Sequence, residues 1–155
     1  MFAKFLLVAD QRARPPVGQI GGQALENLEQ AVTALGKLDG VFCSMLTVAE
    51  RPPAPESDLW YSGRALMIAG GKNNEYFCTF YDEDNSKHAI NPLVHASRGD
   101  YVLIRCGELE SVSRQCIIDR IVAAEALKAF VAEGKLTDQL IWESPKMGKS
   151  REMGV

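Results

Sequence analysis

The sequence predicts an α+β fold, with an antiparallel sheet of about five to six strands and two main helices packed on one face. The prediction comes from the order of patterns along the chain. A β-type apolar run is followed by an amphipathic helical pattern, a block of several β-type runs and a second helical pattern. Strands that follow one another in a block, rather than alternating with helices, are typical of an antiparallel sheet. A chain of 155 residues also has the length of one domain.

The first strand is predicted at residues 2–9, because two prolines and a glycine interrupt the chain soon afterwards. A helix is predicted over residues 23–35 and is expected to end at Gly36. Its apolar residues recur at three- and four-residue spacing, and they are Leu25, Leu28, Val32 and Leu35.

The middle of the chain is rich in β-type residues. Further strands are predicted at residues 41–49, 64–69, 75–81 and 101–105, with a short strand at 116–118. Three prolines exclude regular structure from the loop at residues 50–58. The stretch 70–74, which begins Gly70-Gly71, is predicted as a hairpin loop in which the glycines adopt positive φ.

A second helix is predicted over residues 120–133, with Asp119 as its N-cap and Gly134 as its C-terminal stop. Its apolar row is expected to consist of Ile121, Ala124, Leu127 and Val131, with Phe130 beside them. The predicted domain spans residues 1–143. Residues 144–155 are polar and are predicted to form a flexible tail.

Composition narrows the class of protein. With 46% hydrophobic and 24% charged residues, the chain is predicted to be globular, and a net charge of −3 argues against nucleic-acid binding through bulk positive charge. The longest apolar runs are far shorter than a membrane helix requires, and the apolar run at the N-terminus is shorter than a signal peptide requires. The four cysteines contain no C-x-x-C motif, which favours reduced, mostly buried thiols in the cytoplasm.

No pattern in the sequence predicts catalysis, a metal or a cofactor. His88 and His95 are interpreted as ordinary surface or loop histidines, because no metal-ligand spacing surrounds them. Gly148-Lys149-Ser150 lacks the upstream glycine and flanking elements of a phosphate-binding loop, and G-x-S-x-G is absent. A dyad of Cys78 or Cys116 with His88 or His95 stays open as a minor alternative.

Acidic residues concentrate in the middle of the chain. Residues 75–110 hold seven acidic residues against three basic ones, a local net charge of −4, which includes the contiguous run Asp82-Glu83-Asp84 together with Glu108 and Glu110. A charge run of this kind is commonly a solvated surface. The functional alternative is a patch that attracts a basic partner by charge complementarity.

Several short motifs resemble, in their order, immunity protein family one, the immunity proteins of bacterial polymorphic toxin systems. They are the strand-to-glycine turn at 66–71, the aromatic strand at 74–80 with its acidic turn, the loop at 90–92, the strand start at 99–101, the helix at 123–130, Gly134-Lys135-Leu136 and Leu140-Ile141-Trp142-Glu143. The resemblance covers residues 41–143. Its most specific parts are the glycine turn, where Lys72 occupies the place of the family's usual third glycine, and the Trp142-Glu143 pair.

The resemblance implies an α+β fold without catalysis and a cytoplasmic protein that neutralises a cognate toxin, such as a nucleic-acid deaminase or nuclease. Asp82, Glu83, Asp84, Glu108 and Glu110 are the predicted toxin-binding residues, and no direct contact with nucleic acid or membrane is expected. Trp142 is interpreted primarily as a core residue covering the last helix. Two alternatives remain, a structural adaptor and a small-molecule-binding domain or minor enzyme that uses the Gly70-Gly71 turn near Tyr76.

Overall fold

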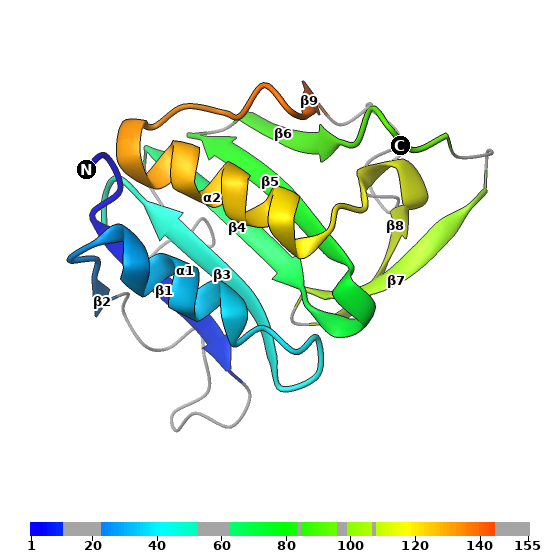
Figure 1. The fold of residues 1–155 in the computed structure, drawn as a ribbon, viewed down its shortest axis with the longest axis horizontal. Coiled ribbons are helices and arrows are strands. Elements are labelled where there is room, and N and C mark those ends of the chain that lie inside the picture. Colours follow the sequence, from blue (N-terminus) through cyan, green and yellow to red (C-terminus); the bar gives the residue numbers. More distant parts are fainter. Residues whose placement is uncertain (11–22, 53–62, 84, 96–98, 107, 145–155) are drawn as a thin grey trace.

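A computed structural model describes residues 1–10, 23–52, 63–83, 85–95, 99–106 and 108–144 (Figure 1). The elements in chain order are β1 Phe5–Asp10, β2 Gln23–Ala24, α1 Leu28–Gly36, β3 Cys43–Ala49, β4 Arg64–Gly70, η1 Lys72–Asn74, β5 Tyr76–Asp82, β6 Asn85–Ile90, β7 Tyr101–Cys106, β8 Glu108–Ser113, η2 Arg114–Cys116, α2 Arg120–Glu133 and β9 Ile141–Glu143. The α+β class predicted from the sequence is confirmed.

Seven strands of the described chain form one antiparallel sheet in the order β2-β1-β3-β4-β5-β6-β9, and β7 and β8 form a separate hairpin. The central pair β4–β5 is in register from Arg64 opposite Asp82 to Gly70 opposite Tyr76. The large sheet has more strands than the five to six expected. β2 and β9 are only two and three residues long, which is too short to give a strand pattern in the sequence. The sequence pattern also missed β6, which is polar in its first half.

Helices α1 and α2 lie side by side across one face of the large sheet, as the sequence predicts (Figure 1). Alternate residues of the central strands meet them, for example Leu66 and Ile68 of β4. Phe130 of α2 is fully buried, and its ring centroid lies 5.5 Å from that of Phe2 and 6.2 Å from that of Phe80. We call this cluster between the helices and the sheet the first core.

The β7–β8 hairpin contributes to a second cluster formed by the other set of alternating residues. Met67 and Ala69 of β4 pack here, although their neighbours Leu66 and Ile68 belong to the first core. We call this cluster the second core, and its buried residues are Met67, Ala69, Phe77, Ile90, Val102, Ile104, Val112 and Cys116. Both faces of the central strands are therefore covered, which explains the continuous burial of β4 from Ala65 to Gly70.

The first helix is shorter than predicted. It begins at Leu28, because the side chain of Asn27 accepts a hydrogen bond from the backbone N–H of Gln30 and caps the helix. Residues 23–24 instead form β2, and the backbone N–H of Leu25 donates to the carbonyl of Lys4 at 2.8 Å. Leu25 precedes the helix but is buried in the first core, so its apolar side chain fitted the helical periodicity by position alone.

The second helix has the predicted bounds, with Asp119 capping its first turn and Gly134 ending it at φ 68°. The predicted apolar row is wrong in one member, since Ile121 is 75% exposed. The buried stripe is Ala123, Ala126, Leu127, Phe130 and Val131. The predicted strand at 116–118 is also wrong, because η2 occupies 114–116 and only Ile118 forms an isolated bridge, with Tyr76.

Candidate partner-binding surface

The predicted acidic residues come from two different sheets. Asp82 is the last residue of β5 and Glu83 lies in the turn to β6, whereas Glu108 and Glu110 lie on β8 (Figure 1). Glu83 is held at φ 53°, and its backbone N–H donates to the carbonyl of Gly63 at 3.1 Å. Asp84 lies outside the described residues.

Asp82 has a cation opposite it in the sheet register, yet it forms no ion pair with any residue that the structure describes. Arg64 is the cross-strand partner of Asp82, but its Nη2 donates to the carbonyl of Gly134 at the end of α2. The guanidinium also lies over two aromatic rings, 5.0 Å from the centroid of Phe2 and 5.6 Å from that of Phe80. Arg64 therefore stabilises the helix terminus, and Asp82 keeps an exposed carboxylate.

Glu108 and Glu110 lie opposite Cys106 and Ile104 in the hairpin. Directly paired residues share one face of a hairpin, so both carboxylates are on the side of Ile104, which packs in the second core. Glu108 is exposed and Glu110 is half-buried. Burial first, and then the nearby charge of Glu110, raise the pKa of the Cys106 thiol to about 12.

Tyr81 and Cys106, which adjoin the two acidic segments, are both half-buried and pack against the second core. Burial raises the pKa of Tyr81, and the negative charges of ionised Cys106 and Cys78 raise it further. Tyr81 immediately precedes Asp82, and Cys106 is the cross-strand partner of Glu108. The structure thus brings two segments that are 26 residues apart in sequence to the same margin of the second core.

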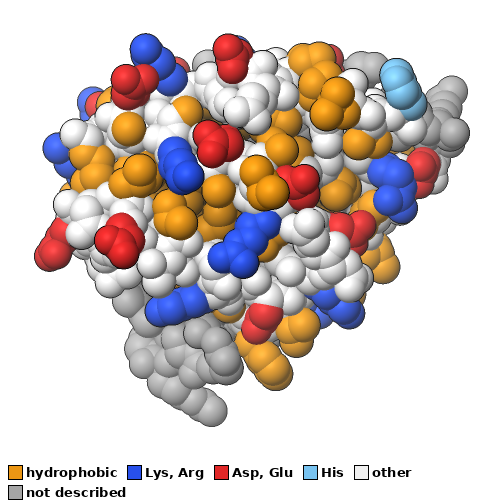
Figure 2. All heavy atoms as spheres, viewed as in Figure 1, with side chains coloured by type: hydrophobic (Ala, Val, Ile, Leu, Met, Phe, Trp, Pro, Cys, Tyr) orange, Lys and Arg blue, Asp and Glu red, His pale blue; other side chains and the backbone are white. Residues whose placement is uncertain are grey.

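The ion pairs within the described residues lie elsewhere. Asp100 pairs with Arg114 at 3.0 Å, and on the helix side Lys128 pairs with Glu125 and Lys135 with Glu133, at 3.7 and 3.5 Å. Figure 2 shows acidic and basic side chains interspersed over this helix-bearing face. Asp82, Glu83, Glu108 and Glu110 have no ion-pair partner among the described residues. Their negative charge is available to a basic partner.

The Gly70-Gly71 turn is closely packed against backbone. Both glycines have positive φ, 110° and 115°, as the sequence predicts. A Cβ on Gly71 would lie 2.3 Å from the carbonyl oxygen of Leu38, and one on Gly70 would lie 2.3 Å from that of Glu75. The next turn, η1, reaches α2, where the backbone N–H of Arg120 donates to Asn74 at 2.9 Å. These contacts explain the glycines without a bound ligand.

Trp142 is a half-buried residue of the edge strand β9 that packs against the first core. Its indole N–H donates to the carbonyl of Thr137 at 3.0 Å. Glu143, the next residue along β9, is exposed and lies opposite His88 in the register. The geometry of Trp142 agrees with its interpretation as a core residue.

His88 is not the surface or loop residue that the sequence predicts. It lies in β6 with 7% of its surface exposed, its Nδ1 is 3.2 Å from Oγ1 of Thr79, and its ring centroid is 5.2 Å from that of Phe77. Burial lowers its pKa. The interpretation failed because the polar residues around His88 concealed strand β6.

The cysteines are thiols whose surroundings disfavour the reactive thiolate. Cys78 is fully buried, which raises its pKa far above the ordinary value. Burial, followed by the charge of Glu143, raises the pKa of Cys116 to about 12. These pKa values disfavour the nucleophilic dyad that the sequence left open.

Comparison with protein-family models gives no match, and comparison with curated proteins likewise gives none. Within the described part of the chain, the helices are too short or too polar to cross a membrane. The same residues contain no cluster of three or more His, Cys, Asp or Glu suited to a metal ion.

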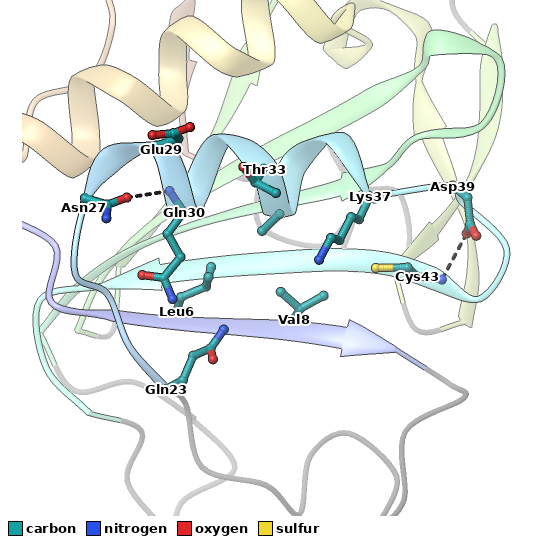
Figure 3. A pocket seen from close by; sticks show the side chains of 11 residues that line it. Leu6, Val8, Gln23, Asn27, Glu29, Gln30, Thr33, Lys37, Asp39 and Cys43 are labelled. Carbon is teal, nitrogen blue, oxygen red and sulfur yellow. Dashed lines mark hydrogen bonds between the residues drawn. The ribbon is translucent and has the colours of Figure 1, made fainter.

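Sequence reasoning missed two surface features. Leu103 and Leu109, on the opposite side of the hairpin from the two glutamates, are 65% and 58% exposed. A groove of about 840 Å³ also runs between α1 and strands β1 and β3 (Figure 3). Alternation around Leu103 could have indicated the first feature, but the groove depends on how a helix sits over a sheet edge, which no local pattern encodes.

Proposed function

We propose that this protein is a cytoplasmic immunity protein that binds a cognate toxin domain and blocks its active cleft. The observation that carries the proposal is the set of four carboxylates, Asp82, Glu83, Glu108 and Glu110, without ion-pair partners among the described residues. The resemblance of residues 41–143 to immunity protein family one supports it. The toxin is expected to be a nucleic-acid deaminase or nuclease.

The proposed mechanism is electrostatic capture. A toxin that acts on nucleic acid needs a basic groove to bind phosphates, and exposed carboxylates offer that groove the same sign of charge. Charges at an interface act strongly on association, which steering can raise from about 10⁵–10⁶ toward 10⁸–10⁹ M⁻¹s⁻¹ at low salt.

The structure allows the two acidic segments to be tested separately. The turn variant carries Asp82→Lys, Glu83→Lys and Asp84→Lys, and the hairpin variant carries Glu108→Lys and Glu110→Lys. Each is measured in a salt series of association rates against a cognate toxin domain, which the proposal expects to be encoded beside the gene for this protein. We expect slower association and a flatter salt dependence for both variants.

The matched control is Glu125→Lys with Glu133→Lys on the helix side, which changes the net charge as much as the hairpin variant does. We expect this control to retain most of the wild-type rate and salt dependence. A toxin domain that does not bind the wild-type protein refutes the proposed function. If the toxin binds but all three variants associate alike, the immunity role stands and the acidic surface is excluded from the interface.

The small-molecule alternative at Gly70-Gly71 is not supported by the geometry. Backbone atoms of Leu38 and Glu75 occupy the space beside both glycines. Tyr76 is 4% exposed, and its backbone is bridged to Ile118.

A further inference from the structure

We propose a second binding site, independent of the toxin-binding surface, in the groove between α1 and the strands β1 and β3. The structure assigns it to an elongated organic anion with an apolar middle. The groove has a volume of about 840 Å³, which is within the usual range for small-molecule sites. Its floor includes Leu6 and Val8 of β1 and Cys43 of β3.

Most of the acceptor groups around the groove are already engaged. Oδ1 of Asn27 accepts the N–H of Gln30, and Oε1 of Gln30 accepts the N–H of Glu26, both at 2.8 Å. Oδ1 of Asp39 accepts the backbone N–H groups of residues 41, 42 and 43. Glu29 turns to the opposite side of α1 from Gln30 and Lys37 (Figure 3).

The remaining polar side-chain groups that line the groove are chiefly hydrogen-bond donors. Lys37 ends at the groove with its ammonium group beneath α1, and Gln23 points into the groove from β2 (Figure 3). The ammonium of Lys37, the hydroxyl of Thr33, the amide of Gln23 and the NH₂ of Asn27 belong to exposed side chains, and these groups are not hydrogen-bonded to another described residue, so they are open to a ligand. A groove with unused donors favours a ligand rich in acceptors.

The positions of these donors set the form of the ligand. Gln30 and Ala34 of α1 and its C-cap residue Lys37 follow one side of the helix, and the seven steps from Gln30 to Lys37 rise about 10 Å along its axis. A negative group is expected at Lys37 and a second acceptor at Gln23 and Asn27. The chain between them would cover Val8, which is half-buried. An extended dicarboxylate such as nonanedioate matches this pattern.

The test is a titration of ¹⁵N-labelled protein with nonanedioate, followed by amide chemical shifts. We expect changes concentrated in α1, in residues 6–8 and at Gln23, with a Kd of about 1 mM or tighter. Nonane-1,9-diol has a similar length and no charge, and it is expected to bind at least about tenfold more weakly.

Lys37→Met is expected to weaken nonanedioate binding about tenfold or more, and Lys37→Arg to restore most of it. The matched control Lys135→Met removes an exposed charge of the same sign beyond α2 and is expected to bind like wild type. Circular dichroism verifies that each variant is folded. Equal affinity for the diol, equal losses in Lys37→Met and Lys135→Met, or shifts scattered over the surface would overturn the proposal.

Discussion

The two faces of the large sheet are covered in different ways, and the difference separates the stable part of the molecule from its candidate binding surface. The first core lies under two helices that also contact each other. Five of the sheet's seven strands contribute buried residues to it, namely β1, β3, β4, β5 and β6. The second core is smaller and is closed largely by one two-stranded hairpin. That hairpin carries exposed leucines, and its two glutamates form no ion pair with another described residue. Binding surfaces are commonly found on such less strongly anchored elements.

The largest expected effect is in the first core. Phe130→Ala removes a fully buried ring that contacts Phe2 and Phe80 edge to face. We expect the free energy of unfolding to fall by about 3–5 kcal/mol, measured by urea denaturation. The matched Ile121→Ala on the exposed side of α2 is expected to cost less than about 0.5 kcal/mol. Similar losses in the two variants would contradict the packing of α2.

The next largest effect is expected at the Gly70-Gly71 turn between β4 and β5, which packs against the segment that follows α1. Gly71→Ala forces a Cβ to within 2.3 Å of the Leu38 carbonyl at φ +115°, and we expect a loss of about 2–3 kcal/mol in thermal unfolding. Gly99→Ala is the control, because Gly99 also has positive φ but a Cβ there meets nothing within 4 Å. Its loss is expected to be about 1 kcal/mol. Equal losses would show that the contact with Leu38 contributes nothing.

A substitution in the second core is expected to lower stability locally, in the hairpin, and not across the whole sheet. Ile104→Val in the hairpin removes one methyl group from a residue that is 3% exposed, which costs about 0.5–1.5 kcal/mol. Native-state hydrogen exchange is expected to report this loss in β7 and β8, with little change in β3, β4 and β5. A uniform loss across all strands would show that the hairpin and the large sheet unfold as one unit.

The smallest effect is a pH dependence in the second core. Burial lowers the pKa of His88, so below about pH 6.5 the unfolded chain takes up a proton before the folded protein does. Stability is therefore expected to fall with acidification, by at most about 1.4 kcal/mol per pH unit from this residue. Thr79 and Phe77 of β5 contact His88, and Glu143 of β9 lies opposite it.

His88→Gln is expected to reduce this pH dependence, whereas His95→Gln, at an exposed position, is expected to leave it unchanged. The measurement is urea denaturation at a series of pH values between about 5 and 8. An unchanged dependence in His88→Gln would assign the acid sensitivity to other groups.

The sequence by itself determined the elements whose signals are local. Helix α2 follows from its periodicity and from the capping residues Asp119 and Gly134, because each cap satisfies backbone groups of its own helix end. The Gly70-Gly71 hairpin and the strands on either side of it follow from glycine's access to positive φ and from continuous apolar runs. The α+β class follows from the order of these elements.

Only the tertiary structure decided the features that depend on distant partners. β2, β6 and β9 are short or polar and become strands because a neighbouring strand supplies their hydrogen-bond partners. Arg64 contacts the end of α2, which leaves Asp82 without an ion pair among the described residues. The hairpin brings Glu108 and Glu110 to the margin of the second core. The groove under α1 exists because a helix and a sheet edge diverge, and a spatial separation of this kind leaves no periodic signal in either segment.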